Sequence, residues 1–160
     1  MINTLSTVKT PCIGVCSTGI GDSVCRGCKR FTKEVIDWNG YSEDQKLAVM
    51  GRIEALLAQV VAAKLLILDE QLLKQGVELQ QVRTGGKKNP YTWVFDLLKE
   101  GAGQIRDLSD YGCKLMPEWR DRPLVELRDA IYKNTLFTHK ILWPPLLVCL
   151  QISHVDLSPH

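Results

Sequence analysis

The stretch that decides the N-terminal part of the fold is PCIGVCSTGIGDSVCRGC, residues 11–28. It places Cys12, Cys16, Cys25 and Cys28 in a C-x3-C-x8-C-x2-C pattern. Thiolates are soft ligands, and four in one short segment are typical of a tetrahedral zinc or an iron–sulfur centre. Residues 17–24 are long enough to reverse the chain, and their small, glycine-containing composition suits a turn. We therefore expect the four cysteines to share one metal ion or cluster.

The rest of the chain favours metal over disulfides. Residues 1–10 contain no apolar run of the kind that a secretory signal needs, and no stretch is apolar enough to span a bilayer. We therefore expect a cytoplasmic protein without a membrane partner, and in that compartment thiols stay reduced. A net charge of +2 is too small to indicate a nucleic-acid partner by itself.

A short helix is predicted directly after the second cysteine pair. Phe31, Val35 and Trp38 follow one another at i, i+4 and i+7, which places them on one helical face. We expect Trp38 to be largely buried against the helix that begins near Ser42. The carboxylate of Glu34 is interpreted as solvated or as a partner of Arg30.

Four cations, Arg26, Lys29, Arg30 and Lys33, surround the second pair, with no acidic residue between Asp22 and Glu34. A zinc ion held by four thiolates carries a formal charge of −2, which nearby cations and amide donors offset. A phosphate-binding patch is the alternative interpretation. The residues named as neighbours of the metal or as binding candidates are Arg26, Lys29, Arg30, Glu34 and Trp38.

These residues resemble the signature of the DUF1289 family, small bacterial proteins often labelled as predicted Fe–S proteins. The family pattern is approximately P-C-I/V-x-x-C followed by C-x-G-C-x-R-T-x-x-E-I-x-x-W. Phe31 stands here in place of the usual threonine and Val35 in place of isoleucine, and neither position is an expected ligand. The resemblance extends from about Thr10 to Leu57 and implies metal binding. It is carried by Pro11, Cys12, Ile13, Cys16, Cys25, Arg26, Gly27, Cys28, Arg30, Glu34 and Trp38.

The four cysteines are expected to form a small metal knuckle at the N-terminus. After it, the sequence predicts a mainly α fold with a bundle of three to five helices and little or no sheet. Ser42 and Gln45 form a capping box for a helix expected to run to about Lys74, with Gly76 as its stop. Residues 79–83 are predicted as a short strand or a frayed helix end, and residues 84–88 as a solvated basic loop. Asn89-Pro90 begins another helix, and Pro123 opens the last.

Three segments are expected. Residues 9–57 form the metal knuckle and the helices that follow it, residues 58–140 form a helical extension packed on it, and residues 141–160 form an irregular tail. Cys113 and Cys149 are interpreted as buried apolar residues rather than ligands. His139, His154 and His160 lack the spacing of a metal or catalytic site.

Three functions are compatible with this pattern. The first is a non-enzymatic zinc protein that acts as a protein-interaction or regulatory module, with an unidentified protein partner or as a homodimer. The second is an iron–sulfur protein in electron transfer or redox sensing, although the spacing matches neither common ferredoxin run. The third, which is the weakest, is a nucleic-acid binder that uses Arg26, Lys29, Arg30, Lys33 and the Lys87-Lys88 loop.

Overall fold

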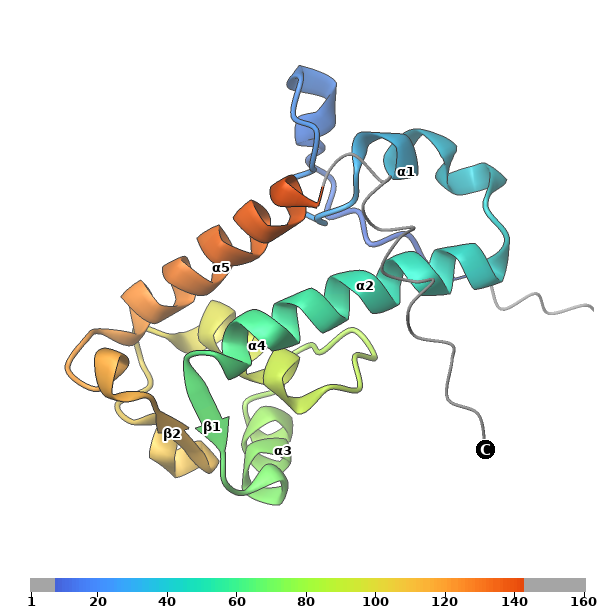
Figure 1. The fold of residues 1–160 in the computed structure, drawn as a ribbon. Helices are drawn as coiled ribbons and strands as arrows, with labels where there is room; N and C mark the ends of the chain where they lie inside the picture. Colours follow the sequence, from blue (N-terminus) through green and yellow to red (C-terminus); the bar gives the residue numbers. More distant parts are fainter. Residues whose placement is uncertain (1–7, 143–160) are drawn as a thin grey trace, which may run out of the picture. The chain divides into compact units, whose positions relative to one another are not determined.

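The computed structural model describes residues 8–142, and within them the chain is mainly helical. The α-helices are α1 (Thr32–Asp37), α2 (Glu43–Ala62), α3 (Glu70–Leu79), α4 (Pro90–Gly101) and α5 (Leu124–Ile141) (Figure 1). Short 3₁₀ turns occur at Ser17–Ile20, Trp38–Gly40, Leu108–Tyr111 and Pro117–Trp119. The expectation of a mainly α chain with three to five helices is confirmed for the described residues.

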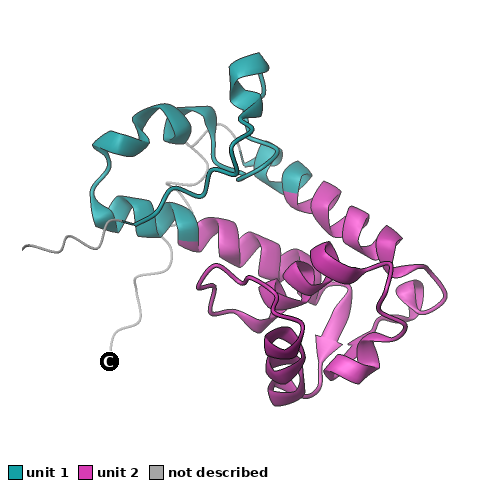
Figure 2. Cartoon of the chain, turned by 180° about the vertical axis from the view of Figure 1, so that it is seen from behind, with its two compact units in different colours: residues 1–50, 136–160 teal, residues 51–135 magenta. Residues whose placement is uncertain are grey.

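The chain divides into two compact units (Figure 2). Within the described residues, one unit comprises residues 8–50 and 136–142, and the other comprises residues 51–135. The boundary predicted after residue 57 lies inside α2, as does the division between the units. Of the predicted tail, only residues 141 and 142 lie within the described part of the chain, and α5 ends at Ile141.

The caps predicted from the sequence are present at the helix starts. Ser42 Oγ accepts from the Gln45 backbone N–H at 3.2 Å, and Gln45 Oε1 accepts from the Ser42 N–H at 2.9 Å, which completes the capping box of α2. Asn89 Oδ1 accepts from the Tyr91 N–H at 3.1 Å, with Pro90 in the first turn of α4. These side chains satisfy backbone donors that a helix start leaves unpaired.

The predicted extension of α2 to about Lys74 is wrong. The helix ends at Ala62 and is followed by β1 (Leu65–Ile67), which pairs antiparallel with β2 (Cys113–Leu115). Leu65 lies opposite Leu115 and Ile67 opposite Cys113. A continuous apolar run does not by itself distinguish a helix from a buried strand, and here the distant partner strand decides.

Gly76 is not a helix stop, as the sequence suggested, but an interior residue of α3. A Cβ at this position would lie 2.3 Å from the Tyr111 ring, so glycine lets the ring pack directly against the helix backbone. α3 begins instead at Asp69, whose Oδ1 accepts from the Leu72 N–H at 3.0 Å. The helix ends at Leu79, and Gln81 then turns the chain with a positive φ of 54°.

One apolar cluster fills the unit of residues 51–135. Its members come from α2, β1, α3, α4, β2, α5 and the turns that join them, and they bury their side chains without any cysteine of the N-terminal cluster. The members are Leu57, Val61, Leu65, Leu73, Val77, Val94, Phe95, Leu97, Leu98, Ala102, Leu108, Cys113, Trp119, Leu127 and Ile131.

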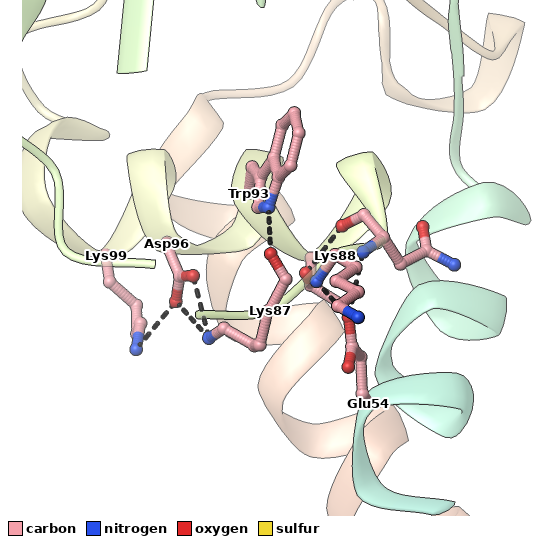
Figure 3. A network of polar contacts seen from close by, with 8 residues as sticks. Glu54, Lys87, Lys88, Trp93, Asp96 and Lys99 are labelled. Carbon is pink, nitrogen blue, oxygen red and sulfur yellow. Dashed lines mark hydrogen bonds and ion pairs between the residues drawn. The ribbon is translucent and has the colours of Figure 1, made fainter. Parts of the chain in front are cut away.

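The basic loop of residues 84–88 forms ion pairs and hydrogen bonds with the rest of its unit (Figure 3). The sequence interpretation of a solvated loop is therefore corrected. Lys87 Nζ lies 2.7 Å from Oδ2 of the buried Asp96, and Lys99 Nζ lies 3.1 Å from Oδ1. Glu54 on α2 accepts from the backbone N–H groups of Lys88 and Asn89, both at 2.8 Å. The loop is therefore held by two carboxylates of its own unit.

We expect Asp96→Ala to destabilise this unit by roughly 1.5–3 kcal/mol, the range for hydrogen bonds to charged groups. The reason is that Asp96 is buried and both lysines lose their common partner. Urea unfolding followed by circular dichroism measures the change. Asp129→Ala is the matched control, because Asp129 is an exposed partner of Arg128 and should change stability by less than about 0.5 kcal/mol. Equal effects of the two substitutions would contradict the assignment.

Candidate metal centre

The second cysteine pair lies in a tight turn closed by backbone pairing. Val24 and Phe31 form an antiparallel bridge, and the Cys25 N–H donates to the Arg30 carbonyl at 2.9 Å. Inside this closure, the Lys29 N–H donates to the Cys25 carbonyl at 2.9 Å. Lys29 adopts a left-handed φ of 65°, which reverses the chain directly after Cys28. The C-x2-C turn is thus fixed by its own backbone.

Cys25 and Cys28 are both buried, and each thiol affects the pKa of the other. Burial raises the pKa of Cys25, but N–H donors of Cys28, Ser17 and Gly27 outweigh this and lower the pKa to about 7. Burial raises the pKa of Cys28, and the guanidinium of Arg30 only partly opposes the increase. The pKa of Cys25 is therefore the lower of the two.

The first cysteine pair is exposed. The Gly14 N–H donates to Cys12 Sγ at 3.4 Å, and Cys16 Sγ lies 2.9 Å from Thr18 Oγ1. Within residues 8–142, no group of three or more histidine, cysteine or acidic side chains is close enough to hold a metal ion. The structure therefore brings Cys25 and Cys28 together but does not bring Cys12 and Cys16 to a common centre with them. A metal shared by all four stays a prediction.

The two cysteine segments nevertheless lie against each other. Ser17 Oγ accepts from the Arg26 N–H at 2.9 Å, and Cys25 Sγ lies 4.0 Å from the Val15 carbonyl oxygen. A Cβ at Gly27 would lie 2.8 Å from the Ile13 side chain, so only glycine allows this approach without displacing Ile13. The contacts place residues 13–17 beside the C-x2-C turn.

The donor set fits a thiophilic metal. Two buried sulfurs are adjacent, one of them has a lowered pKa, and two more cysteines belong to the segment that packs against their turn. Backbone N–H groups and a guanidinium already point at the buried sulfurs, as they do around metal-bound thiolates. Cys25 and Cys28 are thus the part of the predicted ligand set that the structure brings together.

The predicted neighbours of the metal have distinct positions. Arg26 is exposed and pairs with Asp22 at 2.8 Å, whereas the ammonium of Lys29 is buried and donates to the Arg26 and Gly27 carbonyls. Arg30 is buried, with Nε donating to Cys28 Sγ at 3.3 Å. Lys33 pairs with Asp37 at 2.9 Å on the surface of α1.

Glu34 is not a solvated carboxylate. It is buried, and its Oε1 accepts from the Phe31 N–H at 2.8 Å, which caps the start of α1. Thr32 Oγ1 adds a second tie by donating to the carbonyls of Asp22 and Ser23. The helix start is therefore anchored to the residues that lead into the cysteine turn.

Sequence reasoning missed two residues of this unit. Ser17 is buried between the cysteine segments, and only its position next to Cys16 hinted at a role. His139, at the end of α5, is fully buried with its ring edge-on to Phe31 at 6.5 Å between centroids. No local pattern marks a residue so distant in the chain as a neighbour of Phe31.

The other cysteines and histidines fall into two groups. Cys113 is buried in the core of the second unit, as predicted, and burial raises the pKa of its thiol to about 11. Cys149, His154 and His160 lie outside the described residues. No helix in the described part of the chain has both the length and the apolar character needed to cross a membrane.

Comparison with known families identifies the cysteine segment. The model of DUF1289, described as a protein of unknown function, matches residues 10–57. This segment of the chain is thus similar to the DUF1289 family. The match confirms the resemblance seen in the sequence, and it spans the cysteines, α1 and most of α2. Searches of curated proteins and of solved structures gave no match.

Trp38 is 5% exposed, which confirms its predicted burial, and Lys46 of α2 lies 5.9 Å from its ring centroid. We expect Trp38→Ala to destabilise the unit that contains the cysteine segment by about 3–5 kcal/mol, as for other large core truncations. Ile36→Ala is the control, because Ile36 lies on the same helix and is 73% exposed. Urea unfolding monitored by near-ultraviolet circular dichroism measures both. A Trp38→Ala protein as stable as the control would show that the indole is not part of the core.

Proposed function

We propose that the chain is a non-enzymatic metal-binding protein in which Cys12, Cys16, Cys25 and Cys28 hold one Zn²⁺ ion. The carrying observation is the Cys25–Cys28 turn, in which both thiols are buried and the segment of the first pair packs alongside. The zinc ion would supply folding free energy rather than chemistry, because four thiolates leave it no open position for a substrate. The reducing cytoplasm is the compartment that this proposal requires.

The biological role that we propose is regulatory, through contact with a protein partner. The unit of residues 51–135 has an apolar core of its own, so the cysteine segment is not needed to complete that core. Ile13, Val15 and Ile20 are exposed in the same segment as the first cysteine pair. Exposed apolar side chains beside a metal centre are consistent with a docking role.

The alternative is an iron–sulfur cluster on the same four thiolates. Buried sulfurs that accept hydrogen bonds from N–H groups suit a zinc ion and an iron–sulfur cluster equally well. Nucleic-acid binding is a weaker hypothesis. Lys29 and Arg30 are buried, and Arg26, Lys33 and Lys87 have acidic partners, so these cations are engaged within the protein.

Anaerobic purification followed by elemental analysis and an absorption spectrum tests the metal. We expect a colourless protein with one zinc per chain, because the cysteine spacing does not match the common ferredoxin runs. Cys25→Ser combined with Cys28→Ser should abolish stoichiometric metal. Cys113→Ser, which changes a buried core thiol, should retain it. Stoichiometric iron with charge-transfer absorption would replace zinc by the cluster, and a metal-free parent would overturn both.

Removal of the metal should unfold the cysteine segment and spare the helical core. The segment of residues 12–28 has few buried apolar side chains, whereas the core cluster lies wholly in residues 51–135. With a strong chelator, we expect early proteolysis before about Lys33, a resistant C-terminal fragment and little loss of helical circular dichroism. The untreated protein is the control. Global loss of helix would show that the segment is required for the whole fold.

A further inference from the structure

Arg30 occupies an unusual position for a cation. It is 3% exposed, its Nε donates to Cys28 Sγ at 3.3 Å, and its guanidinium carbon lies 4.8 Å from the centroid of the Trp38 ring. The planar guanidinium of Arg30 therefore donates to the sulfur of Cys28 and also lies over the ring of Trp38.

The Cys28 sulfur is the polar partner of the Arg30 guanidinium. Among the described residues, no carboxylate forms an ion pair with Arg30, and the nearest acid along α1, Glu34, accepts from the Phe31 N–H. A buried charge needs compensation, which here comes from the sulfur and from the π face of Trp38. Arg26, four positions earlier, differs in both respects, since it is exposed and paired with Asp22.

The two buried sulfurs therefore have different environments. Cys25 accepts from backbone N–H groups, which any sequence with the same turn would supply. Cys28 accepts from the Arg30 backbone and, in addition, from the Arg30 side chain, whose position depends on a second side chain, Trp38. Hydrogen bonds to a ligand sulfur orient it and modify its donation to a metal, so Cys28 is the ligand whose properties depend on residues outside the turn.

We infer that Arg30 is a positioning residue that orients the Cys28 sulfur, and that Trp38 holds the guanidinium in place. This inference rests on the proposed metal centre for its consequence and on the N–H···S contact for its geometry. Arg30 and Trp38 act as one unit, because loss of the indole frees the guanidinium to turn away from Cys28. A lysine at position 30 keeps the positive charge but lacks the planar guanidinium, which stacks on Trp38 and donates to Cys28 at the same time.

The first test does not depend on which metal is bound. In the full-length chain as purified, without a chelator, the Arg30 Nε–H is identified in ¹H–¹⁵N spectra by its loss in Arg30→Lys, and its exchange with solvent is measured. We expect at least about tenfold faster exchange in Cys28→Ala and in Trp38→Leu, and no change in Cys113→Ser, which alters a core thiol of the other unit. Exchange in Cys28→Ala within twofold of the parent would overturn the inference.

The second test uses Co²⁺ as the probe, with affinity measured from the thiolate-to-cobalt absorption. We expect Arg30→Met and Arg30→Lys to weaken binding by about tenfold or more, and the exposed control Arg26→Met to change it by less than twofold. Helical circular dichroism confirms that each variant is folded. Binding by Arg30→Met that equals the parent's would overturn the inference. If the parent binds no Co²⁺ while the exchange results hold, the metal proposal fails and the Arg30–Cys28 contact stands.

Discussion

The backbone pairing of Val24 with Phe31 is the constraint on which the candidate metal centre depends. It closes the loop that carries Cys25 and Cys28, and its next hydrogen bond, from Cys25 N–H to the Arg30 carbonyl, fixes both ends of the turn. Because Phe31 is also the N-cap residue of α1, the same pairing sets where that helix starts. Cys28, Arg30 and Trp38 then fall into contact because the turn and the helix share this single anchor.

The two units differ in the kinds of side chain that they bury. The unit of residues 51–135 encloses a large apolar cluster, the usual source of stability for a small domain. The buried side chains of the cysteine-bearing unit include a serine, a lysine, an arginine, a glutamate and a histidine beside its few apolar residues. A unit with so little apolar volume depends on satisfied polar contacts, and a metal is the kind of additional support that small units use.

Local patterns predicted the parts of the structure that depend on neighbours in sequence. The cysteine spacing, the capping box at Ser42 and the cap at Asn89 all involve residues within a few positions of each other, and the caps are present as expected. β1 was missed because its partner, β2, lies far along the chain. The burial of Arg30 and the approach of His139 to Phe31 were missed for the same reason: tertiary packing, not periodicity, decides them.

The candidate ligands show the same limit. The pattern C-x2-C specifies a turn, and the structure contains it, but the relation of Cys12 and Cys16 to that turn depends on the approach of Ile13 to Gly27 and of Ser17 to Arg26.

The backbone and the side chain of Lys29 place different requirements on the residue at this position. Its backbone is left-handed, which favours glycine or asparagine, while its ammonium covers two carbonyls of the turn. The two requirements at position 29 therefore oppose each other. Glycine would relieve the backbone conformation but would lose the ammonium that binds the two carbonyls. A β-branched residue would meet neither requirement, so relatives with valine or threonine at this position should be rare.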